Sequence, residues 1–245
     1  MREIGERAFD LCLALSDVEF GDRLETIGDH AFAFCNSLGS IKIPSVRTVQ
    51  TGAFSYCKRL TDVEFGVDLE TIGFNSFDSC TRLERIVIPL KDNLFPVNNI
   101  EQRCTQFDRC YNLTTIKLVG AEEINSIISC FLESWRNEMN QEINRINLEL
   151  PNIPNTLFRK AAMIRRWVRS VIDRMDHYKA EHNRLLKEHM VNLELAVWKA
   201  KLDEKEDDLQ TKRVEVDEKR SKEEKRITSG ADIIIKNVLP FLKLA

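Results

Sequence analysis

The stretch IGDHAFAFCNSL, residues 27–38, carries the spacing that decides the fold. A nearly identical stretch, IGERAFDLCLAL, opens the chain at residues 4–15. Both contain a phenylalanine, a cysteine three residues later and a leucine three residues after that. The chain contains five copies of this set in all. The phenylalanines stand at positions 9, 32, 54, 77 and 107. When the five copies are aligned, equivalent residues form columns with the same spacing in every copy, which indicates an internal repeat.

The repeat is 22–23 residues long, which is the length of one coil of a solenoid. In each unit the pattern L-x-x-I-x-I predicts a short strand whose apolar members point inward. The pattern A-F-x-x-C-x-x-L predicts a tight helical turn on the opposite wall. When the coils stack, the equivalent side chains of successive coils lie next to each other and form a continuous row in the core, which we call a ladder. The step from Phe77 to Phe107 is 30 residues and predicts an outward loop at PLKDNLFPVNNI, residues 89–100.

The segment LGSIKIPSVRTVQTGAFSYC, residues 38–57, resembles the BspA-type leucine-rich repeat. The resemblance extends over residues 4–119 and implies a non-enzymatic solenoid that binds other proteins. It implies no catalytic residues, because the family defines none. The helical remainder of the chain is similar to a tail attached to such repeats in some algal protein families.

The outward positions of the predicted strands form a candidate interaction surface: Asp17, Glu19, Lys42, Asp62, Glu64, Arg85 and Lys117. Adjacent parallel strands place Glu19, Lys42 and Glu64 side by side, where opposite charges can pair. We therefore expect a self-neutralised face, and a strongly charged ligand is not expected. The net charge of −3 gives the whole chain no general attraction for nucleic acid or anionic membranes.

Five of the seven cysteines form one of the repeat columns: Cys12, Cys35, Cys57, Cys80 and Cys110. A row of thiols can bind metal or sense oxidants, or it can supply a small buried hydrophobic group to each coil. We favour the second interpretation, because no C-x-x-C pair is present to form a metal site. An odd cysteine count without a recognisable signal peptide argues against a disulfide framework. No metal and no cofactor are predicted.

After Gly120 the composition changes, and apolar residues recur at three- and four-residue steps. This pattern predicts an amphipathic helix over 121–150 and a second helix that begins after PNIP at 151–154. Two such helices with a short connection predict an antiparallel hairpin. The expected fold class is α+β, with four parts: a leucine-rich-repeat solenoid of five units over 1–120, an amphipathic helical hairpin or coiled coil over 121–200, a charged helix over 201–228 and an apolar tail over 229–245.

The second helix contains a basic cluster around Trp167, formed by Lys160, Arg165, Arg166 and Arg169. This cluster supports an alternative function as a nucleic-acid-associated protein, because basic side chains of this kind contact phosphates. Acidic residues follow within a few turns, however, and a mixed polar face of a helix is most often simply solvated. We therefore rank this alternative second.

Further along the same helix, Met190, Leu193 and Val197 form an apolar stripe with Trp198 beside it. The shorter first helix does not reach this far, so something else must cover the stripe. We expect the apolar tail, Ile233 to Leu242, or a second copy of the chain to do so, and we favour the tail.

The sequence contains no recognisable glycine-rich phosphate loop, metal-ligand spacing or nucleophile–base pair, so an enzyme is the least favoured class. No stretch reaches the roughly 18 apolar residues that a membrane span needs. The sequence thus predicts a non-enzymatic protein-interaction scaffold whose helices dock or self-associate. We expect it to be intracellular, in the cytoplasm rather than the nucleus, and its protein partner is unidentified.

Overall fold

The computed structural model describes residues 1–96, 105–153 and 159–211, with side chains as far as Asp203. The chain divides into two compact units, Met1–Arg184 and Leu185–Ala245. The first unit contains the repeats and the helices that follow them, and the second begins within the long last helix.

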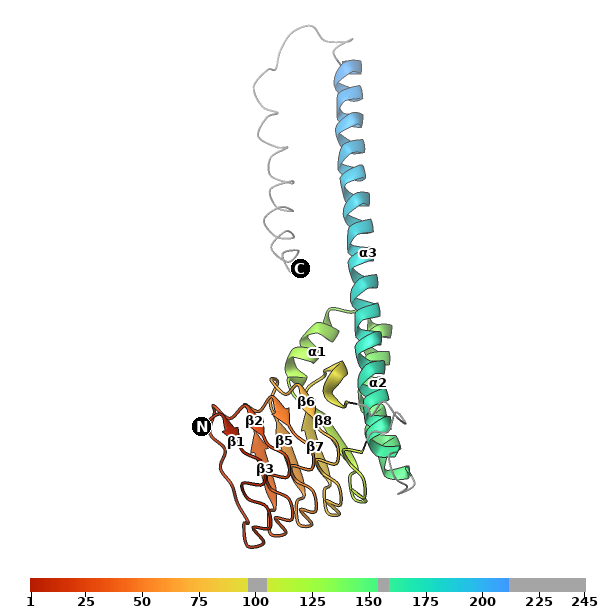
Figure 1. Cartoon of the computed structure of the whole chain (residues 1–245). Coiled ribbons are helices and arrows are strands. Elements are labelled where there is room, and N and C mark those ends of the chain that lie inside the picture. Colours follow the sequence, from red (N-terminus) through yellow and green to blue (C-terminus); the bar gives the residue numbers. More distant parts are fainter. Residues whose placement is uncertain (97–104, 154–158, 212–245) are drawn as a thin grey trace. The chain divides into compact units, whose positions relative to one another are not determined.

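One wall of the repeat region is a parallel sheet formed by β3 (Ser40–Ile43), β5 (Asp62–Phe65), β7 (Arg85–Ile88) and β8 (Thr115–Leu118), seen side by side in Figure 1. The register sets Ile41 beside Val63 and Ile86 beside Ile116, so that equivalent positions of successive coils are aligned. Alternate residues point inward and are buried, as the L-x-x-I-x-I pattern predicts. We call this sheet the strand wall.

The predicted strand of the first coil is absent: residues 17–20 are irregular, although Val18 and Phe20 pack partly against the core. This coil has a neighbouring coil on one side only, among the described residues, so fewer ladder hydrogen bonds hold it straight. Asp17 and Glu19 are exposed there, but they do not lie on the strand wall.

A second parallel sheet consists of β1 (Glu3–Ile4), β2 (Thr26–Ile27), β4 (Thr48–Val49) and β6 (Thr71–Ile72). The sequence analysis did not predict this sheet. Strands of two residues are too short to show the alternation that identifies a strand in a sequence. Their pairing comes from the stacking of the coils and not from a local preference.

The A-F-x-x-C-x-x-L segments form consecutive turns and not the predicted helical turn. We call these residues, 6–14, 29–37, 51–59, 74–82 and 106–112, the turn wall. Their N–H groups donate to the next coil, for example Phe32 to the Ala53 carbonyl at 2.8 Å and Phe54 to the Ser76 carbonyl at 2.8 Å. A helix would use those groups within one coil, so the ladder between coils displaces it.

Left-handed backbone conformations recur along the turn wall. The non-glycine residues with positive φ are Arg7, Leu11, His30, Phe34, Tyr56, Asn75, Ser79 and Arg109. Gly52 has the same conformation at φ 65°, and a Cβ there would lie 2.4 Å from the His30 ring. In the first four coils these residues lie two positions before and two positions after the core phenylalanine. The N–H group of the phenylalanine between them donates to the neighbouring coil.

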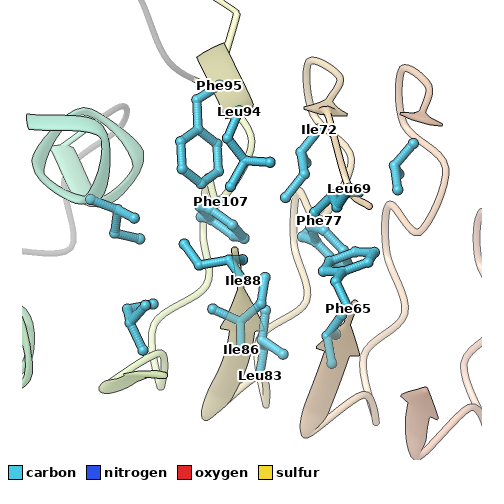
Figure 2. Close-up of a cluster of buried hydrophobic side chains, with 14 of the residues drawn as sticks. Phe65, Leu69, Ile72, Phe77, Leu83, Ile86, Ile88, Leu94, Phe95 and Phe107 are labelled. Carbon is cyan, nitrogen blue, oxygen red and sulfur yellow. The ribbon is translucent and has the colours of Figure 1, made fainter. Parts of the chain in front are cut away.

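The core is a stack of phenylalanine rings that runs through the coils, which confirms the predicted ladder. Ring centres of Phe9, Phe32, Phe54, Phe77 and Phe107 are separated by 5.0, 5.3, 5.5 and 5.6 Å in turn. Figure 2 shows Phe77 and Phe107 in neighbouring coils, with apolar side chains of both sheets around them. Stacked rings at these separations are a favourable aromatic geometry.

The insertion before the last coil does not form a purely outward loop. Residues Asp92–Leu94 form the short 3-10 helix η1, and both Leu94 and Phe95 are buried. Phe95 meets Phe107 edge-on at 5.8 Å, as Phe65 meets Phe77 at 6.2 Å (Figure 2). Part of the insertion therefore folds inward and covers the Phe107 ring. Residues 97–104 lie outside the described part of the chain.

The helical part contains α1 (Ala121–Ser129), α2 (Glu133–Glu149), the 3-10 turn η2 (Leu150–Asn152) and α3 (Arg159–Thr211). The single helix predicted over 121–150 is therefore interrupted at residues 130–132. Ser129 Oγ donates to the Ser126 carbonyl at 2.6 Å, and this side-chain bond competes with the helical ladder. The interruption also allows Phe131 to pack against Tyr178.

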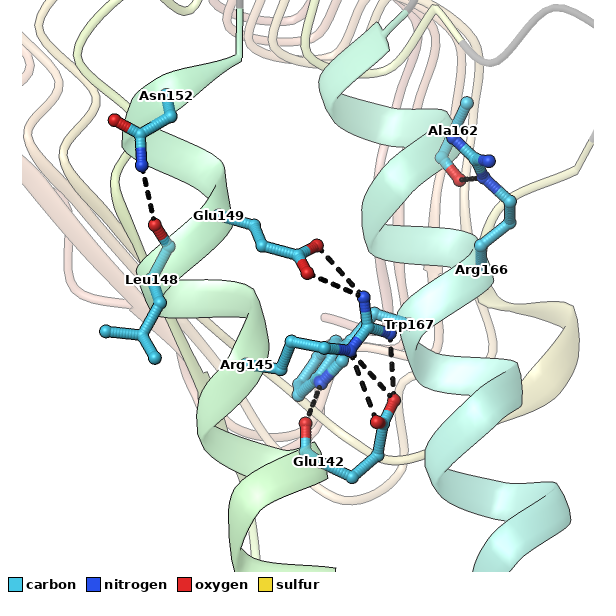
Figure 3. A network of polar contacts seen from close by, with 8 residues as sticks. All are labelled: Glu142, Arg145, Leu148, Glu149, Asn152, Ala162, Arg166 and Trp167. Carbon is cyan, nitrogen blue, oxygen red and sulfur yellow. Dashed lines mark hydrogen bonds and ion pairs between the residues drawn. The ribbon is translucent and has the colours of Figure 1, made fainter.

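Helix α2 and the first part of α3 contact each other along opposite chain directions. Trp135 stacks on Tyr178 at 5.1 Å, and farther along α2 the Trp167 indole donates to the Glu142 carbonyl at 2.9 Å. Figure 3 shows this bond beside Arg145, which binds the carboxylates of Glu142 and Glu149 on its own helix. None of the described helices is long and apolar enough to cross a membrane.

Candidate interaction surfaces

The outward face of the strand wall is occupied by charges that pair with each other. Lys42 lies 3.3 Å from Glu64 on the next strand, and Arg85 Nε donates to Asp62 at 2.7 Å. The hydrogen bond from Arg85 holds the pKa of Asp62 below its usual value. Lys117 on β8 is exposed opposite Val87. This part of the candidate surface therefore carries the neutralised charge expected from the sequence.

The turn wall carries an apolar row that the sequence analysis missed. Leu11, Phe34 and Tyr56 occupy the same position of three successive coils, two residues after the core phenylalanine. Phe34 is 38% exposed, and its ring lies 4.6 Å from the Tyr56 ring in a stacked arrangement. We call these three residues the apolar row. The sequence does contain a signal for this row. The position two residues after the core phenylalanine is apolar in the first three coils, but it is Ser79 and Arg109 in the later two.

The cysteine column lies in the core and has a defined polar role. Each buried thiol donates to the carbonyl of the phenylalanine in the preceding coil, as Cys57 does to Phe32 at 3.1 Å and Cys80 does to Phe54 at 3.1 Å. Burial raises the pKa of Cys35 to about 12 and raises the pKa of Cys80 well above its usual value. The thiol form that donates these bonds is thus the stable form. Among the described residues no cluster of histidine, cysteine or acidic side chains could hold a metal.

Thiol labelling at pH 8, followed residue by residue by mass spectrometry, tests this column. We expect exposed Cys130 to react rapidly in the native protein, whereas Cys35, Cys57, Cys80 and Cys110 react only after unfolding. The reason is that the thiolate is the reactive form, and burial disfavours it while also blocking the reagent. Rapid native labelling of Cys57 at the rate of Cys130 would contradict the ladder.

The end of the repeat region at β8 is closed by the helical part. Asn147 of α2 satisfies both backbone groups of Ile116: the Ile116 N–H donates to Oδ1 at 2.7 Å, and Nδ2 donates to the Ile116 carbonyl at 3.0 Å. One side-chain amide thus takes the place that a further strand would fill. Edge strands need such cover, and terminal coils of solenoids need a cap.

Lys160 closes the turn wall at the same end, so its assignment to a surface basic cluster was wrong. Its side chain is buried, and Nζ donates to the carbonyls of Cys110, Tyr111 and Leu113 at 2.8, 2.9 and 3.0 Å. Burial lowers the pKa of Lys160, but three acceptors at these distances require the three hydrogens of the ammonium form. The group therefore acts as a cationic cap on the last coil.

The other members of the basic cluster do not form a joint surface for phosphate. Arg169 makes two hydrogen bonds to Asp92 of η1, at 2.9 and 3.1 Å. Arg165 is partly buried, and Arg166 is exposed and donates to the Ala162 carbonyl of its own helix (Figure 3). Trp167, at the centre of the cluster in sequence, is buried in the core. The nucleic-acid alternative is therefore not supported.

Beyond Arg184, α3 exposes two apolar rows. The first contains Leu186 and the predicted residues Met190, Leu193 and Val197, all of which are exposed. The second, which we call the outer row, contains Val191, Leu195, Trp198 and Leu202. Trp198 thus belongs to the outer row, because neighbouring residues of a helix point about 100° apart. The tail, Ile233 to Leu242, lies outside the described residues, as does the charged segment after Thr211.

Three solved structures of bacterial proteins resemble this chain. They are a leucine-rich repeat protein of T. pallidum (26% identity, TM-score 0.39), one of Bacteroides ovatus (28%, 0.38) and a leucine-rich cell surface protein of Faecalibacterium prausnitzii (27%, 0.29). The matches cover 47, 48 and 44% of this chain and 62, 28 and 34% of those proteins, respectively. No curated protein matches the sequence.

The sequence profile of the BspA type leucine-rich repeat region matches residues 2–134 in six copies, one more than the five units counted from the phenylalanine column. The match covers more than half of the chain and includes every strand described above. It agrees with the coils, the aligned columns and the parallel sheets of the structure. The chain therefore belongs to the BspA-type leucine-rich repeat family.

Proposed function

We propose that the chain is a non-enzymatic scaffold that binds protein partners through its repeat surface, with the apolar row at the centre of the contact. The family indicates a protein-interaction repeat scaffold, and its members are typically non-enzymatic. A solenoid exposes a large, regular surface that suits this role.

The observation that carries the choice of surface is that the fold does not require apolar residues in this row. Ser79 and Arg109 occupy the same position with the same left-handed φ in later coils, so polar side chains fit there. Phe34 is nevertheless exposed, and its ring stacks on that of the half-buried Tyr56. Exposed aromatic side chains are over-represented among the residues that dominate binding energies. The strand wall offers no such group, since its charges already pair with each other.

The second part of the proposal concerns α3 beyond Arg184. Both of its apolar rows are exposed within the described residues, and contiguous apolar surface of this kind marks docking or self-association sites. The helix would add a second contact to the one made by the repeats.

Capture of partners from an extract of the native cell, with the intact chain as bait, tests the choice of surface. We expect Phe34→Asn with Tyr56→Asn to reduce capture at least about tenfold, since two aromatic anchors are lost. Asparagine tolerates the left-handed φ, so the turn wall should keep its fold. The matched control changes the strand wall by Lys42→Thr with Val87→Thr and should leave capture unchanged.

Two outcomes contradict the proposal. Loss of capture only in the strand-wall variant would move the binding surface to the charged face predicted from the sequence. Capture unchanged in both variants would exclude both walls as the main contact. Circular dichroism and the unfolding midpoint of each variant show that the comparison is between folded proteins.

A further inference from the structure

The turn wall ends in each coil at a tight corner, where the chain turns toward the strand wall. In the third coil the Leu60 N–H donates to the Cys57 carbonyl at 3.2 Å, which closes a β-turn, and the equivalent bond is present in all five coils. We call the two central positions of these turns the corner positions. In chain order they hold Leu13, Ala14, Asn36, Ser37, Lys58, Arg59, Thr81, Arg82, Tyr111 and Asn112.

The charged residues at the corner positions are all basic. We call Lys58, Arg59 and Arg82 the basic corner. All three are exposed, and none makes an ion pair with another residue that the structure describes. Arg59 and Arg82 each stand five residues after the core phenylalanine, so they occupy the same position of adjacent coils. Neighbouring like charges oppose folding, so the stability of the fold does not explain this arrangement.

Other basic residues of the repeat region are neutralised by the adjacent coil, at distances of 2.7 to 3.4 Å. The pairs are Lys42–Glu64, Arg47–Glu70, Arg85–Asp62 and Arg109–Asp78. In these pairs, positions that face each other across coils carry opposite charges. The basic corner breaks this pattern and keeps its positive charge available to an anionic ligand.

The basic corner adjoins the apolar row. Tyr56 precedes Lys58 by two residues in the same coil, and its ring stacks on that of Phe34 at 4.6 Å with an interplanar angle of 7°. Coils lie on both sides of this pair, so the ring faces are turned toward neighbouring coils and the exposed part consists mainly of ring edges. The edge of an aromatic ring carries partial positive charge. A carboxylate therefore finds favourable neighbours at both the rings and the basic corner.

A nucleic acid fits this surface less well than an acidic protein segment. Proteins that bind single strands stack bases on free aromatic faces, and here the two rings cover each other. Asp29 and Asp78 lie on the same wall, and their carboxylates repel a continuous phosphate backbone but leave room for separate carboxylates. The net charge of −3 gives no general attraction for phosphate.

We propose that the partner of the apolar row is an acidic protein segment. An apolar side chain of this segment packs against Phe34 and Tyr56, and neighbouring aspartate or glutamate side chains bind the basic corner. This inference rests on the proposed function and adds the chemical class of the partner to it. Because the three basic groups are exposed, they act mainly on the rate of association, and salt slows that rate.

Selection of random short peptides displayed on phage, with the purified full chain as target, tests the class of partner. We expect enriched peptides to carry aspartate or glutamate beside an aromatic residue or leucine. Fluorescence polarisation with these peptides then compares variants. Arg59→Glu with Arg82→Glu should raise the dissociation constant at least about tenfold, since like charges then face each other. Arg59→Lys with Arg82→Lys keeps the charge and should retain most of the affinity.

The matched control is Arg23→Glu with Lys117→Glu, which changes the net charge equally at two exposed basic residues elsewhere on the repeats and should leave the dissociation constant unchanged. The proposal is overturned if no peptide is enriched, if the enriched peptides lack acidic residues, or if none depends on Arg59 and Arg82. Tighter binding of single-stranded oligouridine, lost on the same charge reversal, would overturn it in favour of nucleic acid.

The variant Phe34→Asn with Tyr56→Asn separates this inference from the proposed function. We expect it to weaken the same acidic peptides. If the enriched peptides need the two rings and not the two arginines, the acidic partner is refuted and the apolar row stands. If they need the arginines and not the rings, the apolar row is refuted as the centre of the contact. Circular dichroism of each variant shows that it is folded.

Discussion

Replacing Phe54 by alanine should lower the free energy of unfolding by about 3–5 kcal/mol, which is the cost of removing a large buried aromatic side chain. Phe54 is fully buried at 0% exposure, between the rings of Phe32 at 5.3 Å and Phe77 at 5.5 Å. The cavity would interrupt the stack in the middle of the repeat region. In a solenoid each coil contacts only its neighbours, so the loss cannot be shared with distant parts of the core.

Urea denaturation followed by circular dichroism measures this change. The matched control is Tyr111→Ala, which removes an aromatic side chain that is 46% exposed and should cost less than about 1 kcal/mol. A loss below about 1 kcal/mol for Phe54→Ala would place this ring outside the core and contradict the ladder.

Replacing Lys160 by methionine should lower the free energy of unfolding by about 2–4 kcal/mol, because three carbonyls of the last coil lose their charge-assisted hydrogen bonds to the ammonium group. The methionine keeps the length and much of the apolar stem, so the change isolates the ammonium group. The carbonyls of Cys110, Tyr111 and Leu113 belong to the last coil, which has no further coil to bond with among the described residues. The substitution should therefore loosen this coil first.

The matched control for Lys160→Met is Arg166→Met, because Arg166 is an exposed basic residue of the same helix. This control should change the free energy of unfolding by no more than about 0.5 kcal/mol. Hydrogen exchange locates the effect: in Lys160→Met, amides of residues 107–118 should exchange faster than in the wild type, and those of residues 40–65 should not. Equal stability of the two variants would show that Lys160 is not a cap.

The repeat columns could be predicted because they depend on local sequence. Phe32, Phe54 and Phe77 are separated by one coil, and their burial follows from the period alone. The strands of the strand wall follow in the same way from the alternation of apolar residues. The break near residue 130 could not be predicted, because no glycine or proline marks it, and because the contact that Phe131 makes there is with Tyr178 of a later helix.

The surfaces were harder to predict than the core. Phe34 and Tyr56 have left-handed φ values within the turn wall, and the sequence analysis did not single them out, because a local apolar pattern does not show which side chains turn outward. The sequence analysis assigned Lys160 to the surface, because the carbonyls that accept its hydrogen bonds lie 47 to 50 residues earlier in the chain. Both cases depend on contacts between distant segments, about which a local pattern carries no information.

The central claim, that partners bind at the apolar row of the turn wall, is tested most directly by photo-crosslinking in the native cell. Tyr56 is replaced by a benzophenone-bearing phenylalanine, which keeps an aromatic ring at this position, and Val87 on the strand wall is replaced in the same way in a second protein. The account predicts that the chain with the probe at position 56 forms a covalent complex with a partner on irradiation, and that the chain with the probe at position 87 does not. Crosslinking from position 87 alone, or from neither position while the partner is still captured, would contradict it.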